Sequence, residues 1–294
     1  QRDSIKQRDI EQVVLIGYGA KKKSDLTGSI TALSEKDFNK GAITSAEGLL
    51  NGRTSGVVVT QSGTPGNDAV IRVRGGSSLL SSNDPLIVID GLPVEGGLSS
   101  INPNDIESFS ILKDASSTAI YGNRGSNGVI LITTKKGSKK KLQVSFNSFT
   151  TYNTLAKNVD VYNGDQFREI INTMAPDKAN LLGTANTNWQ DLIFRNTASF
   201  DSNLSLMGNL FDKIPSRLSI GHTENEGLLL TSNYKRSTAS FTLNPTLFDN
   251  HLKLNISGNY TYAFRTNADE GAIGSAISYD PTQSPYDAQT PFAG

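Results

Sequence analysis

Cysteine is absent from the 294-residue sequence, which excludes a disulfide framework and any site built on a thiolate. Histidine is nearly absent as well. His222 and His251 lie far apart, and neither has a second histidine at the spacing of a metal site. We therefore expect no structural metal site and no cofactor.

A surplus of either charge is also missing. The 28 lysines and arginines balance the 28 aspartates and glutamates, so no global basic field attracts nucleic acid. The basic runs at 21–23 and 139–141 are short, and such runs are usually solvated boundaries between segments. No apolar run approaches the roughly 18 residues that a membrane-spanning helix requires. Nucleic-acid binding and a bundle of membrane-spanning helices are therefore not expected.

Motifs of catalysis are lacking too. The sequence has no phosphate-binding loop of the G-x-x-x-x-G-K-[ST] form and no nucleophile elbow around a serine. Gly17-Tyr18-Gly19 is only a fragment of a dinucleotide-binding fingerprint. Asp105 and Glu107 would share one strand face, as a glycosidase pair could, but nothing supplies the rest of such a site. We do not expect an enzyme.

The most informative stretch is residues 102–137. Residues 106–112 alternate apolar and polar side chains, which predicts a half-buried strand. Asp114 suits the start of a short helix at 115–121, and the β-branched run at 128–134 suits a buried strand. The stretch predicts a strand–helix–strand unit within a small mixed sheet.

Glycine and aspartate mark the turns of this region. Tight backbone turns around Arg124 are permitted by three glycines that also end the helix, Gly122, Gly125 and Gly128. Asp90 followed by Gly91 is far more often a turn than a catalytic acid. We therefore predict a turn at 90–91.

Shorter elements are expected before this unit. Thr44 with Glu47 three residues later is the capping-box pattern, which predicts a short helix at 44–51. Strands are predicted at 26–33, 57–60, 69–74 and 86–89. Arg72 and Arg74 lie on one face of their strand and need partners, which either acidic residues of another element or solvent can supply.

After residue 137 the pattern changes. Alternating segments, several with aromatic ends, predict strands at 142–152, 200–208, 217–223, 238–244 and 252–264. The connections between them alternate between long and short, and the first long one contains a predicted helix at 164–174. A soluble β-sandwich also alternates, but an excursion of roughly 45 residues is uncommon in one. The pattern is typical of a transmembrane barrel wall.

Three stretches together resemble one protein family. They are EQVVLIGYGAKKKSDLTG at 11–28, IRVRGGSS with DPLIVIDGLPV between 71 and 94, and IESFSILKDASSTAIYGNRGSNGVILITTKKG at 106–137. In this order and spacing they are similar to the plug region of SusC/RagA-family TonB-dependent outer-membrane transporters. The resemblance implies a mainly β fold with a small α+β plug, followed by the first antiparallel strands of a barrel of about 22 strands.

The resemblance also divides the chain. It implies a flexible leader with a TonB-box-like segment at 1–19, a plug domain at 20–137, and the first part of the barrel with long extracellular loops at 138–294. The five predicted strands cannot close around such a plug, and lipid satisfies no open sheet edge. We expect the remaining strands to come from a missing part of the chain or from another chain.

Residues 10–16 form a short β-prone run without an evident hairpin partner. Such a strand can add to the sheet edge of another protein. The resemblance implies a TonB contact through Glu11, Gln12, Val13, Val14, Leu15 and Ile16. The alternative is that 13–16 is only the first strand of the plug.

Other plug positions carry implied structural roles. The resemblance implies contacts with the barrel wall for Arg72, Arg74 and Arg124. It also implies a structural motif of the plug, which consists of Asp90, Gly91, Lys113, Asp114, Tyr121, Gly122 and Gly128.

The function that the resemblance implies is active import of a nutrient, a glycan oligosaccharide or a peptide, across the bacterial outer membrane. The plug would gate the barrel. The implied partners are TonB with its inner-membrane motor proteins, a SusD-like surface lipoprotein and the lipid bilayer. The alternative is a β-rich cell-surface binding or adhesion module without active transport, which predicts solubility without detergent and no role for 13–16.

Overall fold

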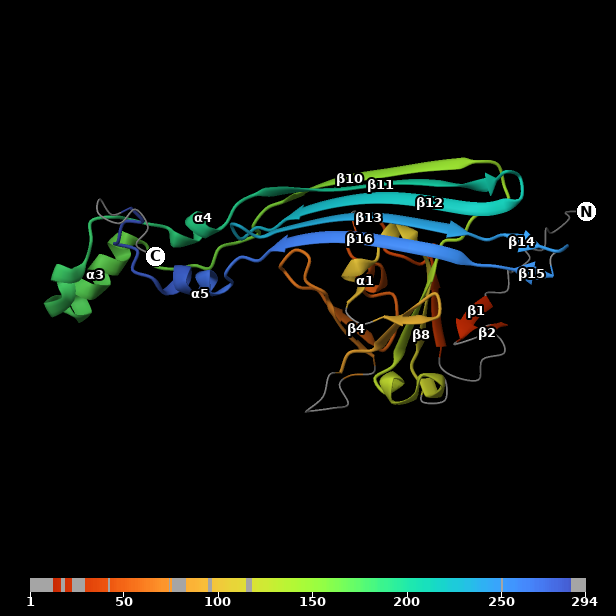
Figure 1. The fold of residues 1–294 in the computed structure, drawn as a ribbon. Coiled ribbons are helices and arrows are strands. Elements are labelled where there is room, and N and C mark those ends of the chain that lie inside the picture. The colour runs from red at the N-terminus through yellow and green to blue at the C-terminus, as the bar shows by residue number, and fades with distance from the viewer. Residues whose placement is uncertain are drawn as a thin grey trace, which may run out of the picture.

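The computed structural model of the chain describes residues 13–16, 19–22, 30–41, 43–73, 75, 83–94, 97–114, 118–249 and 251–286. Two five-stranded sheets dominate the fold. One forms the centre of a compact plug, and the other forms a long, gently curved wall along one side of the plug (Figure 1). The predicted mainly β fold, with an amino-terminal plug followed by antiparallel strands, is confirmed.

The plug sheet has the strand order β3-β8-β9-β6-β7. These strands are β3 (Ile30–Ser34), β6 (Leu86–Ile89), β7 (Leu92–Val94), β8 (Ile106–Leu112) and β9 (Val129–Thr134). β6 and β9 pair in parallel, whereas the other neighbours pair antiparallel. The predicted strands at 86–89 and 106–112 are confirmed with the same bounds.

Both faces of the plug sheet are buried. Along β9, Ile130 and Ile132 belong to one core cluster, whereas Val129 and Leu131 belong to a second cluster on the opposite face. Phe109 of β8 is fully buried and meets Phe38 edge to face, with ring centroids 5.5 Å apart. Removal of this apolar surface from water on both faces holds the plug together.

Short elements surround this sheet. They are α1 (Ala46–Leu50), η2 (Leu98–Ser100), η3 (Pro103–Asp105) and the antiparallel pair β4 (Val57–Thr60) and β5 (Val70–Val73). The helix predicted at 44–51 is therefore present, but the predicted capping box is wrong. Ser45 occupies the N-cap position without a side-chain cap bond, and Glu47 is buried.

The helix predicted at 115–121 is present in its described part. Thr118 is helical, and the 3-10 helix η4 (Ala119–Gly125) follows it directly, whereas residues 115–117 are outside the described residues. The N–H of Thr118 donates to the carbonyl oxygen of Asp114 at 3.0 Å. Gly122, at φ 58° and ψ −145°, interrupts η4 as its lack of a side chain permits.

The amino-terminal strand has a partner within the chain. β1 (Val13–Ile16) pairs antiparallel with β2 (Gly19–Lys22) in a two-stranded sheet of its own. The expectation of a strand without a hairpin partner is therefore wrong. Only two residues separate the strands, so closing the hairpin restricts little chain. β1 also lies close to β9, the middle strand of the plug sheet.

The wall is antiparallel, with the order β10-β11-β12-β13-β16, and it does not close on itself. Its strands are β10 (Gln143–Asn153), β11 (Thr197–Leu210), β12 (Ile214–Glu226), β13 (Asn233–Leu243) and β16 (Ile256–Thr266). The strand predicted at 252–264 is wrong at its start, because β15 (Leu252–Lys253) pairs with β14 (Thr246–Leu247) instead. Pro245 has no N–H and cannot extend the β13 ladder, so the chain turns away there.

The side chains of the wall follow an inside-out pattern. On β12, Leu218 and Ile220 point away from the plug and are 43% and 53% exposed. Ser219 and Thr223 alternate with them, face the plug and are buried. β13 repeats this pattern, with Phe241 outward. Apolar side chains outward and polar side chains inward are typical of a barrel wall that faces lipid.

A lobe of short helices lies at one end of the wall, opposite β14 and β15 (Figure 1). The connections at 154–196 and 267–286 build it with α3 (Gly164–Met174), η5 (Pro176–Leu181), α4 (Trp189–Ile193) and α5 (Gly271–Ser278). The Trp189 indole donates to the Asp280 carbonyl at 3.0 Å and meets the Tyr279 ring, which joins the two connections. The helix predicted at 164–174 is confirmed. Across the described parts of the chain, no helix is long and apolar enough to cross a membrane.

Candidate functional site

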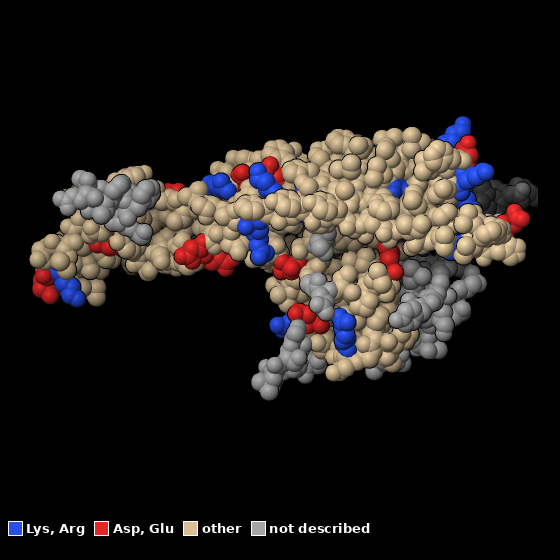
Figure 2. All heavy atoms as spheres, viewed as in Figure 1, with Lys and Arg blue, Asp and Glu red and all other residues tan. Residues whose placement is uncertain are grey.

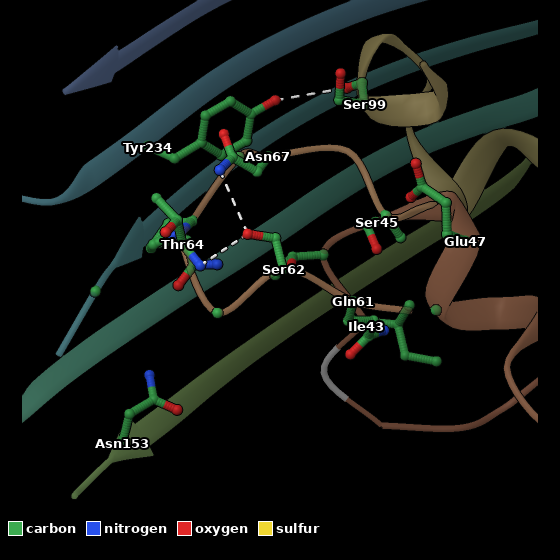
Figure 3. Close-up of a pocket in the computed structure, with 18 of the residues that line it drawn as sticks. Ile43, Ser45, Glu47, Gln61, Ser62, Thr64, Asn67, Ser99, Asn153 and Tyr234 are labelled. Atoms are coloured by element: carbon green, nitrogen blue, oxygen red, sulfur yellow. Dashed lines mark hydrogen bonds between the residues drawn. The ribbon is translucent and has the colours of Figure 1, made fainter. Parts of the chain in front are cut away.

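A polar cavity of about 740 Å³ lies between the plug and the wall, at the end nearest the lobe (Figure 3). The plug contributes α1 and the loop at 61–67, and the wall contributes the ends of β10, β12 and β13. Neutral amides and hydroxyls are frequent in its lining: Asn39, Ser45, Asn51, Gln61, Ser62, Thr64, Asn67, Asn153 and Asn225. These groups offer both donors and acceptors without a net charge.

Arg236 on β13 fastens one side of this cavity to the plug. Its guanidinium is buried, and its Nη1 donates to the Ser99 carbonyl at 2.8 Å. Its Nη2 donates to the Thr44 carbonyl at 2.9 Å and to Thr223 Oγ1 at 3.4 Å. The planar fork of donors suits several fixed acceptors at once. One wall side chain therefore holds two separate segments of the plug.

Glu47 on α1 is buried in the same part of the cavity wall, and its Oε2 has no hydrogen-bond partner among the described residues. Burial raises the pKa of the Glu47 carboxyl, while its backbone hydrogen bond, the Ser45 side chain and the charge of Arg236 act in the opposite direction. The surroundings therefore favour the neutral acid more than water does.

A second wall arginine pairs with a plug acid. Arg217 on β12 donates to Asp105 Oδ1 at 2.7 Å, and Ser240 on β13 donates to Asp105 Oδ2 at 2.8 Å. Both charged side chains are buried. Nearby, Asn102 Nδ2 donates to Thr238 Oγ1 at 3.1 Å. A buried pair of this kind is tolerated only when both charges keep their partners.

The plug loop at 61–67 connects the cavity to the wall and the lobe. Arg265 at the end of β16 donates to the Gly66 carbonyl at 3.0 Å and to Asn67 Oδ1 at 2.7 Å. Thr64 donates to Glu270 Oε1 at 2.5 Å, directly before α5. A ligand in the cavity would therefore touch a loop that also contacts the wall and the base of the lobe.

Asp90 is a turn residue, as predicted. Its φ is 49°, and its carboxylate accepts hydrogen bonds from the N–H of Thr134 at 2.9 Å and the hydroxyl of Thr134 at 2.5 Å. Gly91 follows at φ 89° and completes the turn between β6 and β7. The carboxylate ties this turn to the end of β9, which is a structural role.

Other residues of the predicted plug motif also have structural surroundings. Lys113 donates to the Ser55 carbonyl, and Tyr121 packs against the second core cluster. Gly128 has φ 93°, and a Cβ there would lie 3.0 Å from the Val73 side chain. A larger residue would be strained by both the backbone and the packing.

Three plug arginines were predicted to contact the wall. Arg72 is exposed on β5 and has no ion pair among the described residues, and Arg124 is exposed in η4. Arg74 lies outside the described residues. Their wall contacts stay a prediction. Two arginines of the wall, Arg217 and Arg236, contact the plug, and their signal in the sequence was a charge on the inward face of an alternating strand.

The segment predicted to contact TonB is only partly within the described residues. Val13, Val14, Leu15 and Ile16 form β1, whereas Glu11 and Gln12 lie outside the described residues. The hairpin with β2 leaves one edge of β1 without a strand in the described chain. An isolated two-stranded hairpin is marginally stable, so either that edge or the hairpin itself could exchange partners.

Comparisons with known proteins agree with this arrangement. Residues 22–129 match the profile of the family described as TonB-dependent Receptor Plug Domain. The chain is 47% identical to the TonB-dependent receptor SusC of Bacteroides thetaiotaomicron, over 96% of this chain and 29% of that protein. It is 37% identical to the TonB-dependent receptor P26 of Formosa agariphila, over 97% of this chain and 30% of that protein. The chain thus spans less than a third of the length of either relative.

Among solved structures, the RagAB peptide transporter superposes with a TM-score of 0.73 at 25% sequence identity. The match covers 82% of this chain and 31% of the matched one. Plug and wall strands therefore share their arrangement with that transporter.

Proposed function

This chain carries the plug domain and the following wall strands of a SusC/RagA-type TonB-dependent receptor of the bacterial outer membrane, and on that premise we propose that the protein imports a nutrient across this membrane with energy delivered through TonB. The observation that carries the proposal is the polar cavity enclosed between the plug and the inward face of the wall. The plug fills that face, so a substrate passes only if the plug moves or rearranges.

In the cavity lining Lys40 and Arg236 balance Glu47 and Glu226, and the other polar side chains are neutral, which favours a neutral, hydroxyl-rich substrate. Amide side chains such as Asn153 and Gln61, with hydroxyls such as Ser62, suit sugar hydroxyls, which both donate and accept hydrogen bonds. We therefore propose a glycan oligosaccharide as the substrate. The RagAB structure is that of a peptide transporter, which makes a peptide the second candidate.

TonB engages the β1 segment in this proposal. Strand addition along the open edge of β1, or exchange of β2 for a TonB strand, supplies main-chain hydrogen bonds without a demand on particular side chains. Because β1 lies close to β9, a pull on β1 loads the middle of the plug sheet first.

A SusD-like lipoprotein is assigned to the lobe. The cavity lies at that end of the wall, and the lobe exposes large apolar side chains, including Tyr162 and Leu181. Co-purification of the lipoprotein with the wild-type receptor but not with a Tyr162→Ser/Leu181→Ser variant checks this placement. Equal recovery with both would reject it.

Binding of the purified periplasmic domain of TonB tests the proposed function. The wild-type receptor is compared with a Val14→Pro/Ile16→Pro variant, in which two backbone donors of β1 are lost. A Val14→Ala/Ile16→Ala variant keeps the donors and serves as the control. We expect binding and oligosaccharide uptake to be lost with proline and kept with alanine.

Two outcomes would contradict this proposal. Binding that survives the proline variant removes β1 as the TonB contact. Folded receptor that binds no TonB in any form and imports nothing supports a passive surface-binding module. Uptake of peptide but not of oligosaccharide would keep the import mechanism and replace the substrate.

A further inference from the structure

The end of the wall away from the lobe carries two turns with the same unusual residues. Between β11 and β12, Phe211 and Asp212 have φ values of 52° and 56°. In the β14–β15 hairpin, Phe248 and Asp249 have φ values of 52° and 50°. Aspartate tolerates left-handed backbone, but phenylalanine does so reluctantly, and hairpin turns normally place Asn or Gly there. The same strained choice at two turns points to a role for the aromatic rings.

Neither phenylalanine ring is buried within the protein. Phe211 is 80% exposed and Phe248 is 75% exposed. Leu247 and Leu252 beside Phe248 are also exposed, so the β14–β15 hairpin presents an apolar tip. Burying these side chains therefore requires something outside the described chain.

Lysines accompany the two turns. Five exposed lysines lie at this end, Lys139, Lys140, Lys141, Lys213 and Lys253, and none makes an ion pair among the described residues. The bridge between Ser138 and Ser216 brings the basic run to the base of β12. Asp212 and Asp249 are the acids of the two turns, so positive charge predominates. Figure 2 shows basic side chains at this end of the wall, with acidic ones beside them.

The position of these residues matches the inner boundary of the membrane. On β11 the outward apolar residues run from Phe200 to Leu210, and ten residues of tilted strand span about 25 Å across a bilayer, the height of a barrel's apolar band. Phe211 follows Leu210 directly. The lobe grows from the long connections, which face outside, so the short turns belong to the periplasmic side.

We propose that Phe211, Phe248 and the five lysines form a rim that binds anionic phospholipid headgroups of the inner leaflet of the outer membrane. The rings insert at the level of the headgroups, and the lysine stems lie along the apolar band while their ammonium groups meet lipid phosphates. A zwitterionic headgroup offers the same phosphate with a competing ammonium, so the rim prefers a net negative lipid. This inference rests on the membrane location and does not depend on TonB or on the substrate.

Native mass spectrometry of the full-length receptor with added lipid tests the rim. Phosphatidylglycerol and phosphatidylethanolamine with the same acyl chains are compared as probes. We expect the wild type to retain phosphatidylglycerol preferentially. A Lys139→Gln/Lys140→Gln/Lys141→Gln variant should lose roughly a hundredfold of that preference, at roughly fivefold for each of the three lysines. A Lys36→Gln/Lys157→Gln/Lys178→Gln variant removes three exposed lysines elsewhere and should behave as wild type.

Three results would overturn the proposal. They are equal retention of the two lipids by the wild type, an unchanged preference in the rim variant, and displacement of phosphatidylglycerol by inorganic phosphate, which would leave a simple anion site.

A Phe211→Gly/Phe248→Gly variant separates lipid anchoring from turn geometry. Glycine relieves the left-handed backbone, so the melting temperature in detergent should stay equal or rise. In bilayers that contain phosphatidylglycerol, the lost anchors should lower it relative to wild type. The same gain in detergent and bilayer would show that the rings contact no lipid and would reject their part in the rim.

Discussion

The plug sheet and the wall sheet have five strands each, but they bury opposite kinds of side chain. In β9 of the plug, every residue from Val129 to Ile132 is buried and apolar. In β12 of the wall, the buried residues include Arg217 and Ser219, while Leu218 and Ile220 are exposed. Side chains alternate in the same way along both strands. The surroundings differ, because both faces of β9 pack against apolar parts of the plug, whereas the outward face of β12 is the lipid-facing side of a barrel wall.

This difference determines how the two sheets can meet. An apolar inward face on the wall would have packed into the apolar core of the plug. The polar inward face contacts the plug through hydrogen bonds and buried ions instead. Asp105 with Arg217, and Arg236 with plug carbonyls, are such contacts. Polar contacts are specific in direction, and water can replace them when the plug rearranges. A gate benefits from that property.

Truncation of the plug core should have the largest effect. Phe109→Ala removes a fully buried ring and should destabilise the plug by about 3–5 kcal/mol. The matched change in the wall, Phe241→Ala, removes an outward ring and should have a much smaller effect in detergent. Hydrogen exchange of the β8 and β9 amides measures the first change. Equal protection in both variants would contradict the comparison.

Breaking the buried ion pair should have the second-largest effect on stability. Arg217→Met leaves the Asp105 carboxylate buried without its partner, and about 3–5 kcal/mol should be lost from the seating of the plug. A double variant, Arg217→Met/Asp105→Leu, should recover most of it. The exposed pair of Lys157 and Asp160 is the control, where Lys157→Met should change little. Thermal unfolding in lipid nanodiscs of the wild type, Arg217→Met, Asp105→Leu and the double variant completes a double-mutant cycle, and Lys157→Met is measured beside them.

A charge on the outward face should be harmful only in lipid. Leu218→Arg should destabilise the wall by about 2–4 kcal/mol in a bilayer, since the side chain lies within the apolar band. Met174→Arg places the same charge on an exposed position of the lobe and should have almost no effect. If both variants behave alike in bilayers, the outward face of the wall does not contact lipid.

Glu47 should give the smallest effect, visible only as a function of pH. Its raised pKa means that the folded state binds the proton more tightly than the unfolded state does. The carboxyl therefore contributes stability below about pH 4.5, and this contribution is lost as the pH rises through the folded pKa.

Glu47→Gln removes that dependence. We expect the variant to be more stable than wild type near pH 7, by roughly 1 kcal/mol, and to show no such advantage at acidic pH. Melting temperatures across this range measure it. A stability gain independent of pH would mean that the carboxyl is not held towards its neutral form.

Much of the fold could be predicted because the pattern that defines each strand lies within a single segment of the sequence. Residues 106–112 and 86–89 were predicted with the observed bounds, since an apolar pattern between turn residues defines a strand locally. The five wall strands were found, but β11, β12 and β13 were predicted too short, because the residues near their lobe ends, such as 224–226, are polar and do not alternate. The start of β16 was missed because Leu252, Leu254 and Ile256 keep their alternation through the break after Pro245.

The site was harder to predict, because it is assembled from distant segments. Asp105 and Arg217 are 112 residues apart, and each was an ordinary residue in its own strand pattern. Asp105 was considered only with Glu107, which is exposed, whereas Asp105 turns inward to the wall. The partner of β1 was missed because β2 contains glycine and lysines, which are poor strand formers.

The central claim is that the plug must move against this wall for transport to occur. The chain has no cysteine, so a cysteine pair at Asn102 and Thr238, which hydrogen bond across the interface, can be joined by a cleavable thiol-reactive linker. Uptake by cells that produce the full receptor is then measured before and after cleavage. We predict that linked receptor imports nothing and that cleavage restores uptake. Undiminished uptake by fully linked receptor would contradict the account.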